Sequence, residues 1–200
     1  MRPAILLLAL FACLLFAGCE NALIEWDAQP APAVCPSGTC PDAGTCPYKD
    51  VPPVDVPKAL RQANYAGGSC NHASLITVLR WQGLEDPARK WRQNYAGGAD
   101  VTDLADIADG LGLRFAYTNG GDAGFLEWCS RTRRGAAIHY YPGHAVTFLG
   151  YVGAQAVLVN NNDTTHLIHV PKTEFIAAWK GYGGKAITVV YSPAPPRPWI

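Results

Sequence analysis

The sequence predicts an α+β domain, with helices in the first part of the domain and an antiparallel sheet in the second. Apolar residues with helical spacing dominate after residue 70, and short β-type runs dominate after residue 136. A doubly wound sheet would instead alternate the two types along the chain. Apolar residues make up 49% of the 200 residues and charged residues only 16%. Most of the chain can therefore bury a core and is not disordered.

The expected elements follow from local patterns. Residues 70–83 carry an apolar helical stripe, which starts behind Gly67-Gly68-Ser69 and stops at Gly83. Further helices are expected at 86–91, 101–111 (capped by Asp100 or Thr102), 122–131 and 172–180. Strands are expected at 113–118, 136–141, 145–151, 156–160 and 186–191, with a hairpin turn at 151–155. Residues 64–68 and 94–98 both read Asn-Tyr-Ala-Gly-Gly, and two copies indicate similar turns rather than a repeat array.

The N-terminus predicts export. Arg2 precedes an unbroken apolar run over residues 4–17, which is shorter than the roughly 20 residues that span a bilayer. Residues 1–18 therefore read as a signal peptide. The run ends in Leu-Phe-Ala-Gly before Cys19, which resembles the bacterial lipobox. The expectation is a chain lipidated at Cys19 and anchored to the membrane of the bacterial cell envelope, on its periplasmic or extracellular face. An ordinary signal peptide is the alternative.

A proline-rich tether is expected over residues 19–55, because residues 20–58 hold eight of the 16 prolines and mostly lack periodicity. Cys35, Cys40 and Cys46 lie within it. Their spacing favours a small disulfide-closed loop over a zinc site, with the third cysteine reaching Cys129 or another molecule. The folded domain is expected over 56–192, followed by a proline-rich tail over 193–200.

Charge and composition exclude several partners and cofactors. Lys and Arg together number 16, as do Asp and Glu, and the pI is near 6.9, so no nucleic-acid partner is expected. His166 and His169 lie three residues apart without a Cys or carboxylate at a convincing spacing. We therefore expect no metal and no cofactor.

Cys70 is the first candidate for chemistry, because it stands where the first predicted helix begins. Unpaired backbone N–H groups and the helix dipole stabilise negative charge at that position, which favours the thiolate. The thiolate is the nucleophilic form of cysteine. Glycines before it allow a substrate backbone to approach closely. A buried structural cysteine or one half of a disulfide is the alternative.

His144 and the polar run that follows the next strand complete the candidate site. His144 precedes the apolar strand at 145–149, where a neutral imidazole can take a thiol proton or form an ion pair with the thiolate. A hairpin at 151–155 would bring His144 beside the run Asn160-Asn161-Asn162-Asp163. One of these side chains would then fix the imidazole tautomer. The register leaves the choice among them open, and a polar strand end without a role is the alternative.

The order Cys, His, Asn or Asp on helix, strand and strand resembles the papain-like cysteine peptidases. At closer range it resembles the bacteriocin-processing, double-glycine peptidase-like family. The resemblance is carried by residues 62–75 (QANYAGGSCNHASL), 143–151 (GHAVTFLGY), 157–162 (VLVNNN) and 173–179 (TEFIAAW), and it covers roughly residues 56–191. It implies a papain-like fold, with N-terminal helices packed on a C-terminal antiparallel sheet.

The resemblance also implies roles for individual residues. Cys70 would be the nucleophile, His144 the general base, and Asn160 the orienting residue, where many relatives carry Asp. Gln62 would be the oxyanion donor together with the Cys70 backbone N–H. The family glutamine usually lies six residues before the cysteine, where this chain has Asn64. The shorter Asn64 amide also carries N–H donors, which makes it the alternative.

These inferences predict an exported thiol hydrolase that cleaves peptide or amide bonds, with a peptide or protein as its substrate. Two alternatives keep the same fold: an inactive peptide-binding lipoprotein, and an acyl transferase of transglutaminase type or a cell-wall amidase. A structural envelope protein, in which Cys70 is disulfide-bonded, is the third. A reduced Cys70 with a low pKa distinguishes the enzyme from the others.

Overall fold

A computed structural model describes residues 56–191. The predicted signal peptide, Cys19, the tether with its three cysteines and the C-terminal tail lie outside the described residues. The helices are α1 (Cys70–Trp81), α2 (Glu85–Asn94), α3 (Val101–Gly110), α4 (Ala123–Arg131) and α5 (Lys172–Gly181), with a 3-10 turn, η1, at Lys58–Leu60. The strands are β1 (Phe115–Thr118), β2 (Ala136–Tyr141), β3 (His144–Val152), β4 (Gln155–Asn160), β5 (Asp163–Pro171) and β6 (Ala186–Val189). Within this part of the chain, no helix has the length and hydropathy that a bilayer crossing requires.

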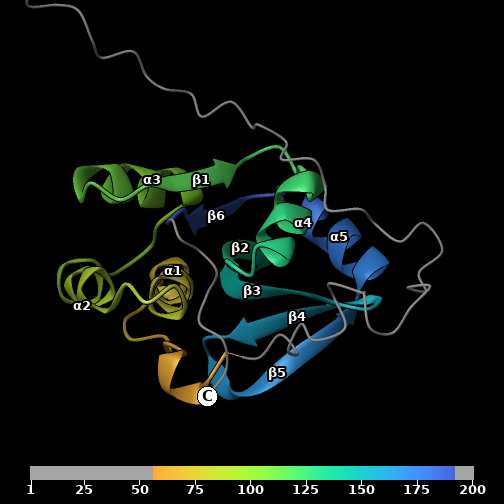
Figure 1. The fold of residues 1–200 in the computed structure, drawn as a ribbon, viewed down its shortest axis with the longest axis horizontal. Coiled ribbons are helices and arrows are strands. Elements are labelled where there is room, and N and C mark those ends of the chain that lie inside the picture. The colour runs from red at the N-terminus through yellow and green to blue at the C-terminus, as the bar shows by residue number, and fades with distance from the viewer. Residues whose placement is uncertain (1–55, 192–200) are drawn as a thin grey trace, which may run out of the picture. The chain divides into compact units, whose positions relative to one another are not determined.

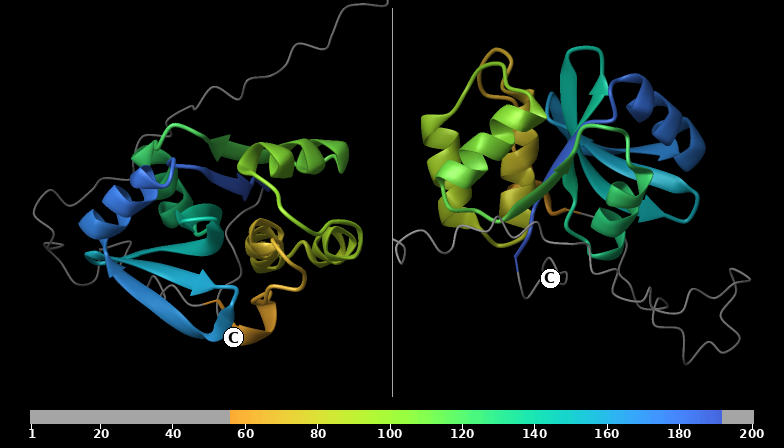
Figure 2. Two further views of the ribbon diagram at one scale, coloured as in Figure 1. Left: turned by 180° about the vertical axis from the view of Figure 1, so that it is seen from behind. Right: turned by 90° about the horizontal axis from the view of Figure 1, so that it is seen from above.

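The α+β prediction is confirmed. The six strands form one antiparallel sheet in the order β1-β6-β2-β3-β4-β5, and the helices pack against it (Figure 1). Helices α1, α2 and α3 share one apolar cluster with β2 and β6, while α4 and α5 share another with β2, β3 and β4. The sheet therefore carries helices on both faces, and the two later helices cover the face that α1 leaves free (Figure 2).

Helix α1 is the central helix, because every one of its residues except Arg80 is buried. Such all-round burial is typical of a helix enclosed by the core. Its buried polar side chains are paired where they meet neighbouring elements. The His72 ring accepts a hydrogen bond at Nδ1 from Trp91 Nε1 of α2, at 3.0 Å, and Thr77 Oγ1 accepts one from the backbone of Gln62. The helix is thus fixed in rotation as well as in position.

Every predicted helix and strand is present, and one further strand is found. Helix α2 runs further than predicted, and Asp100 caps α3 in a capping box with Asp103. Strand β5 is not among the strands expected from sequence, because the pattern there indicates only a polar strand end and a turn. It lies at the sheet edge, paired with β4, and its residues are exposed or only partly buried. An edge strand of this kind needs no strong apolar alternation, so the sequence pattern carries little signal for it.

The two Asn-Tyr-Ala-Gly-Gly turns pack against each other directly in front of α1. The Tyr65 hydroxyl donates to the Tyr95 carbonyl oxygen at 2.6 Å, and the Arg92 guanidinium lies 3.6 Å from the centre of the Tyr65 ring. Gly68 has a φ of +78°, and a Cβ added there would lie 3.0 Å from the Gly98 nitrogen. Glycine at 68 is therefore required both by its backbone angle and by the close approach of the second turn.

Replacing Gly68 by alanine should destabilise the protein, and replacing its neighbour should not. We expect Gly68→Ala to lower the free energy of unfolding by about 1–3 kcal/mol, because alanine is strained at positive φ and meets the second turn. Gly67 has no heavy atom within 4 Å of its would-be Cβ, so Gly67→Ala is the matched control, with a change below about 1 kcal/mol. Urea unfolding measures both. Equal losses in the two variants would contradict this account of the turn contact.

Candidate active site

Cys70 is the first residue of α1, at the helix end that faces the two glycine turns. The turn before it is held by Ser69, whose hydroxyl accepts hydrogen bonds from the backbone N–H groups of Tyr65 and Ala66 at 3.2 and 3.0 Å. Cys70 is a free thiol with 6% of its surface exposed. As the first helical residue, its backbone N–H has no acceptor within the helix. The predicted environment for a thiolate is therefore present at this position.

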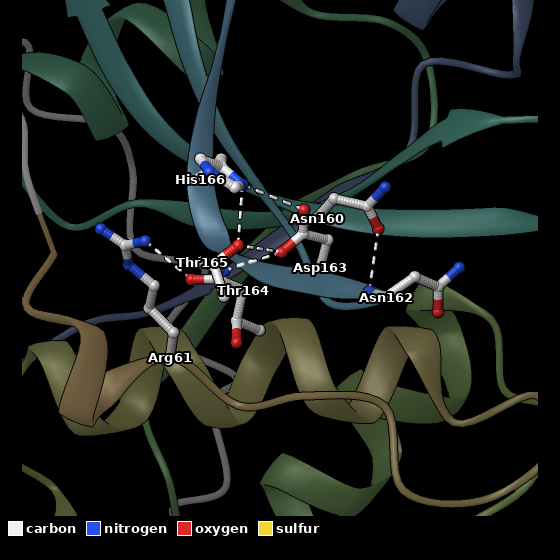
Figure 3. A network of polar contacts seen from close by, with 7 residues as sticks. All are labelled: Arg61, Asn160, Asn162, Asp163, Thr164, Thr165 and His166. Carbon is white, nitrogen blue, oxygen red and sulfur yellow. Dashed lines mark hydrogen bonds and ion pairs between the residues drawn. The ribbon is translucent and has the colours of Figure 1, made fainter.

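His144 and Asn160 meet across the two strands that follow. His144 opens β3 and Asn160 closes β4, and the two strands pair with Thr147 opposite Val159. This register brings His144 Nε2 to 2.9 Å from Asn160 Oδ1. Among the four alternatives in the polar run, Asn160 is the one that contacts His144. Asp163 instead bonds Thr165 and His166 at the exposed sheet edge (Figure 3).

The Asn160 side chain is locked in one orientation by a second hydrogen bond. Its Oδ1 also accepts the backbone N–H of Asn162 at 3.0 Å, an Asx turn visible in Figure 3. The same oxygen must therefore accept from His144, which places a proton on Nε2. In the neutral ring this leaves Nδ1 as the basic nitrogen, and Nδ1 is the atom left to face Cys70. The geometry therefore selects the Nε2–H tautomer of the neutral ring.

The side chains of Cys70 and His144 are hydrogen-bonded, and their pKa values move in opposite directions. Burial raises the pKa of the Cys70 thiol, but the hydrogen bond with His144 lowers it. The backbone N–H groups of Ala145 and Asn71 and the charge of His144 lower it further, so the thiol pKa lies below its ordinary value. The hydrogen bond to Cys70 raises the pKa of His144, and this outweighs the effect of burial. Both shifts favour a thiolate beside an imidazolium.

The structure does not bring Gln62 to this pair. The Gln62 backbone N–H donates to Thr77, and its side-chain oxygen accepts from Arg80 Nη1 at 3.0 Å. Arg80 is ten residues beyond Cys70 in sequence, which corresponds to about 15 Å along a helix axis. The Gln62 side chain therefore lies along the later turns of α1 and not at its start.

Asn64, the alternative amide, lies at the start of α1. Its Oδ1 accepts from the Ser69 hydroxyl, and its Nδ2 donates to Asn162 Oδ1 at 3.1 Å. Its backbone N–H also donates to the Asn161 carbonyl oxygen at 2.7 Å. An amide nitrogen carries two hydrogens, so one N–H of Asn64 is left for another acceptor.

Two features of the site were not found from the sequence. The Tyr141 ring stacks against the His144 ring, with centroids 6.0 Å apart and an angle of 28° between planes. The second is Asn161, which is 2% exposed and donates from Nδ2 to the Cys70 carbonyl oxygen. Sequence offered Asn161 only as a possible partner of His144, because a run of three asparagines does not reveal which way each side chain points.

The remaining candidate residues lie apart from the pair. Cys129 is a wholly buried free thiol in the cluster of α4 and α5, and burial raises its pKa well above the ordinary value. The pairing of Cys129 or another molecule with the third tether cysteine, Cys46, stays a prediction, because Cys46 lies outside the described residues. In residues 56–191, no group of three His, Cys, Asp or Glu side chains is arranged to hold a metal ion.

Comparisons with known proteins bear on the fold. No protein-family model matches the chain, and no curated protein does. Among solved structures, the chain is similar to a C39-like peptidase from Bacillus anthracis, with 14% identity, a TM-score of 0.56, and coverage of 68% of this chain and 96% of that one. A second is the peptidase domain of Streptococcus ComA, with 15% identity, a TM-score of 0.48, and coverage of 65% of this chain and 97% of that one. A third is a double glycine motif protease from an AMS/PCAT transporter in complex with a leader peptide, with 17% identity, a TM-score of 0.44, and coverage of 64% of this chain and 87% of that one. The first likeness confirms the papain-like peptidase fold.

The bond between Asn160 and His144 predicts how two substitutions change the histidine. Asn160→Ala removes the acceptor of Nε2–H, so we expect the His144 pKa to fall. Asn160→Asp places a carboxylate beside the imidazolium and should raise the His144 pKa by about 1 or more. Histidine titration by NMR measures both. Asn162→Ala, which keeps the backbone N–H that holds residue 160, is the control and should leave the titration unchanged.

If the His144 pKa in Asn160→Ala equals that in the unmodified protein, the orienting role assigned to this bond is wrong. A fall of the His144 pKa in the Asn162→Ala control would show instead that the whole turn, and not the one acceptor, sets the pKa.

Proposed function

We propose that this protein is a thiol hydrolase that cleaves peptide or amide bonds, with Cys70 as nucleophile and His144 as general acid and base. The observation that carries the proposal is the hydrogen-bonded series Cys70, His144, Asn160, in which the thiol pKa is lowered and the imidazole pKa is raised. A merely structural cysteine in a buried site would show the opposite shift, as Cys129 does. The peptidase-like fold supports the same reaction class.

The reaction runs through an acyl-enzyme. The Cys70 thiolate attacks the carbonyl carbon of the substrate, and a tetrahedral oxyanion forms. The C–N bond then breaks as His144 gives its Nδ1 proton to the leaving amine, which leaves a thioester on Cys70. A water molecule attacks the thioester after giving a proton to His144, the C–S bond breaks, and the acid product leaves. The thiolate and the imidazolium are thereby restored.

The oxyanion is assigned to the donors at the start of α1. The Cys70 backbone N–H is one donor, because it has no acceptor within the helix. The second is the remaining N–H of Asn64, in place of the Gln62 amide expected from sequence. The contacts of Gln62 with Arg80 support this reassignment.

An extended peptide is the substrate class that the surroundings favour. Gly67 and Gly98 in the paired turns, and Gly143 beside His144, all have empty space where a Cβ would stand. Backbone without side chains on both sides of the pair allows another backbone to approach closely. Bulky side chains at these positions would obstruct that approach.

Export and lipid attachment at Cys19 are part of the proposal. They are supported by the apolar run at 4–17 and the Leu-Phe-Ala-Gly-Cys sequence that ends it. The mature protein would then act at the membrane of the bacterial cell envelope, anchored through the lipid. Intact-mass analysis of the protein purified from membranes tests this. An N-terminus at Cys19 carrying acyl chains is expected, and an unmodified Cys19 would contradict it.

The thiolate–imidazolium pair predicts a characteristic reactivity of Cys70 towards iodoacetamide. Alkylation, followed by mass spectrometry of the peptide that carries Cys70, should give an apparent pKa well below the reference of about 8.5. Because the thiolate reacts and the thiol does not, alkylation should stay fast as pH falls until that lowered pKa is reached. His144→Ala removes the hydrogen bond and the charge, so the apparent pKa should rise.

Peptide hydrolysis completes this test. Turnover of a peptide library should be lost in Cys70→Ser, which keeps the size of the side chain but not the thiolate. The hydrolase proposal is contradicted if the Cys70 pKa has its ordinary value and does not change in His144→Ala. That result would leave a peptide-binding protein of the same fold as the better description.

A further inference from the structure

The Asn161 side chain joins the two elements that carry Cys70 and His144. Its Nδ2 lies 2.9 Å from the Cys70 carbonyl oxygen, 2.9 Å from the Ala145 carbonyl oxygen, and 3.0 Å from Ser74 Oγ. Cys70 and Ser74 occupy successive turns at the start of α1, and Ala145 directly follows His144 in β3. Asn161 itself comes from the connection between β4 and β5, so one buried amide links three separate segments.

This position requires a hydrogen-bond donor. Two of the three partners are backbone carbonyl oxygens, which accept hydrogen bonds and cannot donate them. A carboxylate at 161 would therefore place its oxygens, which only accept hydrogen bonds, against carbonyl oxygens that also only accept them. The nitrogen must point at these oxygens, and its two N–H groups are shared among them.

The partners of Asn161 are the residues that set the distance between sulfur and imidazole. The Ala145 backbone N–H donates towards the Cys70 sulfur and helps to lower the thiol pKa. Thr147 Oγ1 donates to the Ser74 carbonyl oxygen at 3.3 Å and ties β3 to α1 one turn further along. The bond from Asn161 to Ala145 therefore holds the strand next to the helix end at the level of the sulfur.

The other end of the Asn161 amide is unsatisfied. Its Oδ1 is buried and has no hydrogen-bond partner. An orphaned buried acceptor costs stability. Such atoms also occur elsewhere in the described residues, so this one shows only that the Asn161 amide is oriented by its nitrogen and not by its oxygen.

We propose that Asn161 is a positioning residue, which fixes the Cys70 sulfur and the His144 ring at the separation that sustains the thiolate–imidazolium pair. The inference rests on the proposed function. Asn160 orients the ring through Nε2, and Asn161 sets how close the ring lies to the sulfur. The adjacent asparagines thus control two different properties of the Cys70–His144 pair, namely the orientation of the ring and its distance from the sulfur.

A double-mutant cycle in the full-length protein tests this role. The apparent pKa of Cys70 alkylation is measured for the unmodified protein, Asn161→Ala, His144→Ala and the double variant. We expect Asn161→Ala to raise the apparent pKa by about one pH unit, which lowers the thiolate fraction by about tenfold at any pH well below that pKa. The rise should be much smaller in the His144→Ala background, where there is no ring to position and only the Ala145 backbone N–H still acts on the sulfur.

Two further variants separate positioning from stability. Leu126→Ala removes a fully buried side chain of α4, in the cluster on the opposite face of the sheet, and should lower the melting temperature without changing the Cys70 pKa. Asn161→Ser keeps one donor, so it should fold even if Asn161→Ala does not, and its rise in pKa should be smaller. These variants are measured in the same two backgrounds.

The outcomes are distinguishable. If the unmodified protein and His144→Ala have the same Cys70 pKa, the proposed function fails, and the positioning role falls with it. If those two differ while the Asn161 variants match the unmodified protein, the positioning role alone is overturned. An equal rise in both backgrounds also overturns it, because Asn161 would then act on the helix start and not through His144.

Discussion

The structure depends on the burial of α1 between the sheet and the other N-terminal helices. A helix enclosed on nearly all sides can neither rotate nor slide without opening the core, so its first residue is held at a fixed point. Cys70 occupies that point. The strand ends that carry His144 and Asn160 are fixed by the same packing, because β3 lies directly against α1. The chemistry of the site is therefore a property of the core as much as of the three side chains.

The side chains of the polar run at the end of β4 point in different directions, because side chains alternate along a strand. Asn160 faces the imidazole, Asn161 turns into the protein towards α1, and Asn162 turns out to the loop that carries Asn64. Chemically identical neighbours thus serve three different partners. What distinguishes them is backbone direction, which changes from one residue to the next as the chain leaves β4.

Most helices and strands could be predicted from the sequence, and the features that could not be predicted have physical causes. Helix periodicity and the glycine turn placed Cys70 at the start of a helix, and the apolar run after His144 placed that residue at the start of a strand, as the structure has them. The choice of Asn160 needed the strand register, which also contains a bulge near Phe148 and is not encoded locally. The contacts of Gln62 could not be predicted, because tertiary interactions with Thr77 and Arg80 set the path of the loop before α1. Strand β5 could not be predicted, because a strand at an exposed sheet edge does not need alternating apolar residues.

The paired glycine turns have a consequence for how this protein can evolve. Because a Cβ on Gly68 would lie 3.0 Å from the Gly98 nitrogen, a change in either turn is transmitted through backbone to the peptide unit in front of Cys70. A substitution in the second turn would therefore act on the start of α1 without altering Cys70, His144 or Asn160. The two turns thus constrain each other's sequence, although they lie far apart along the chain.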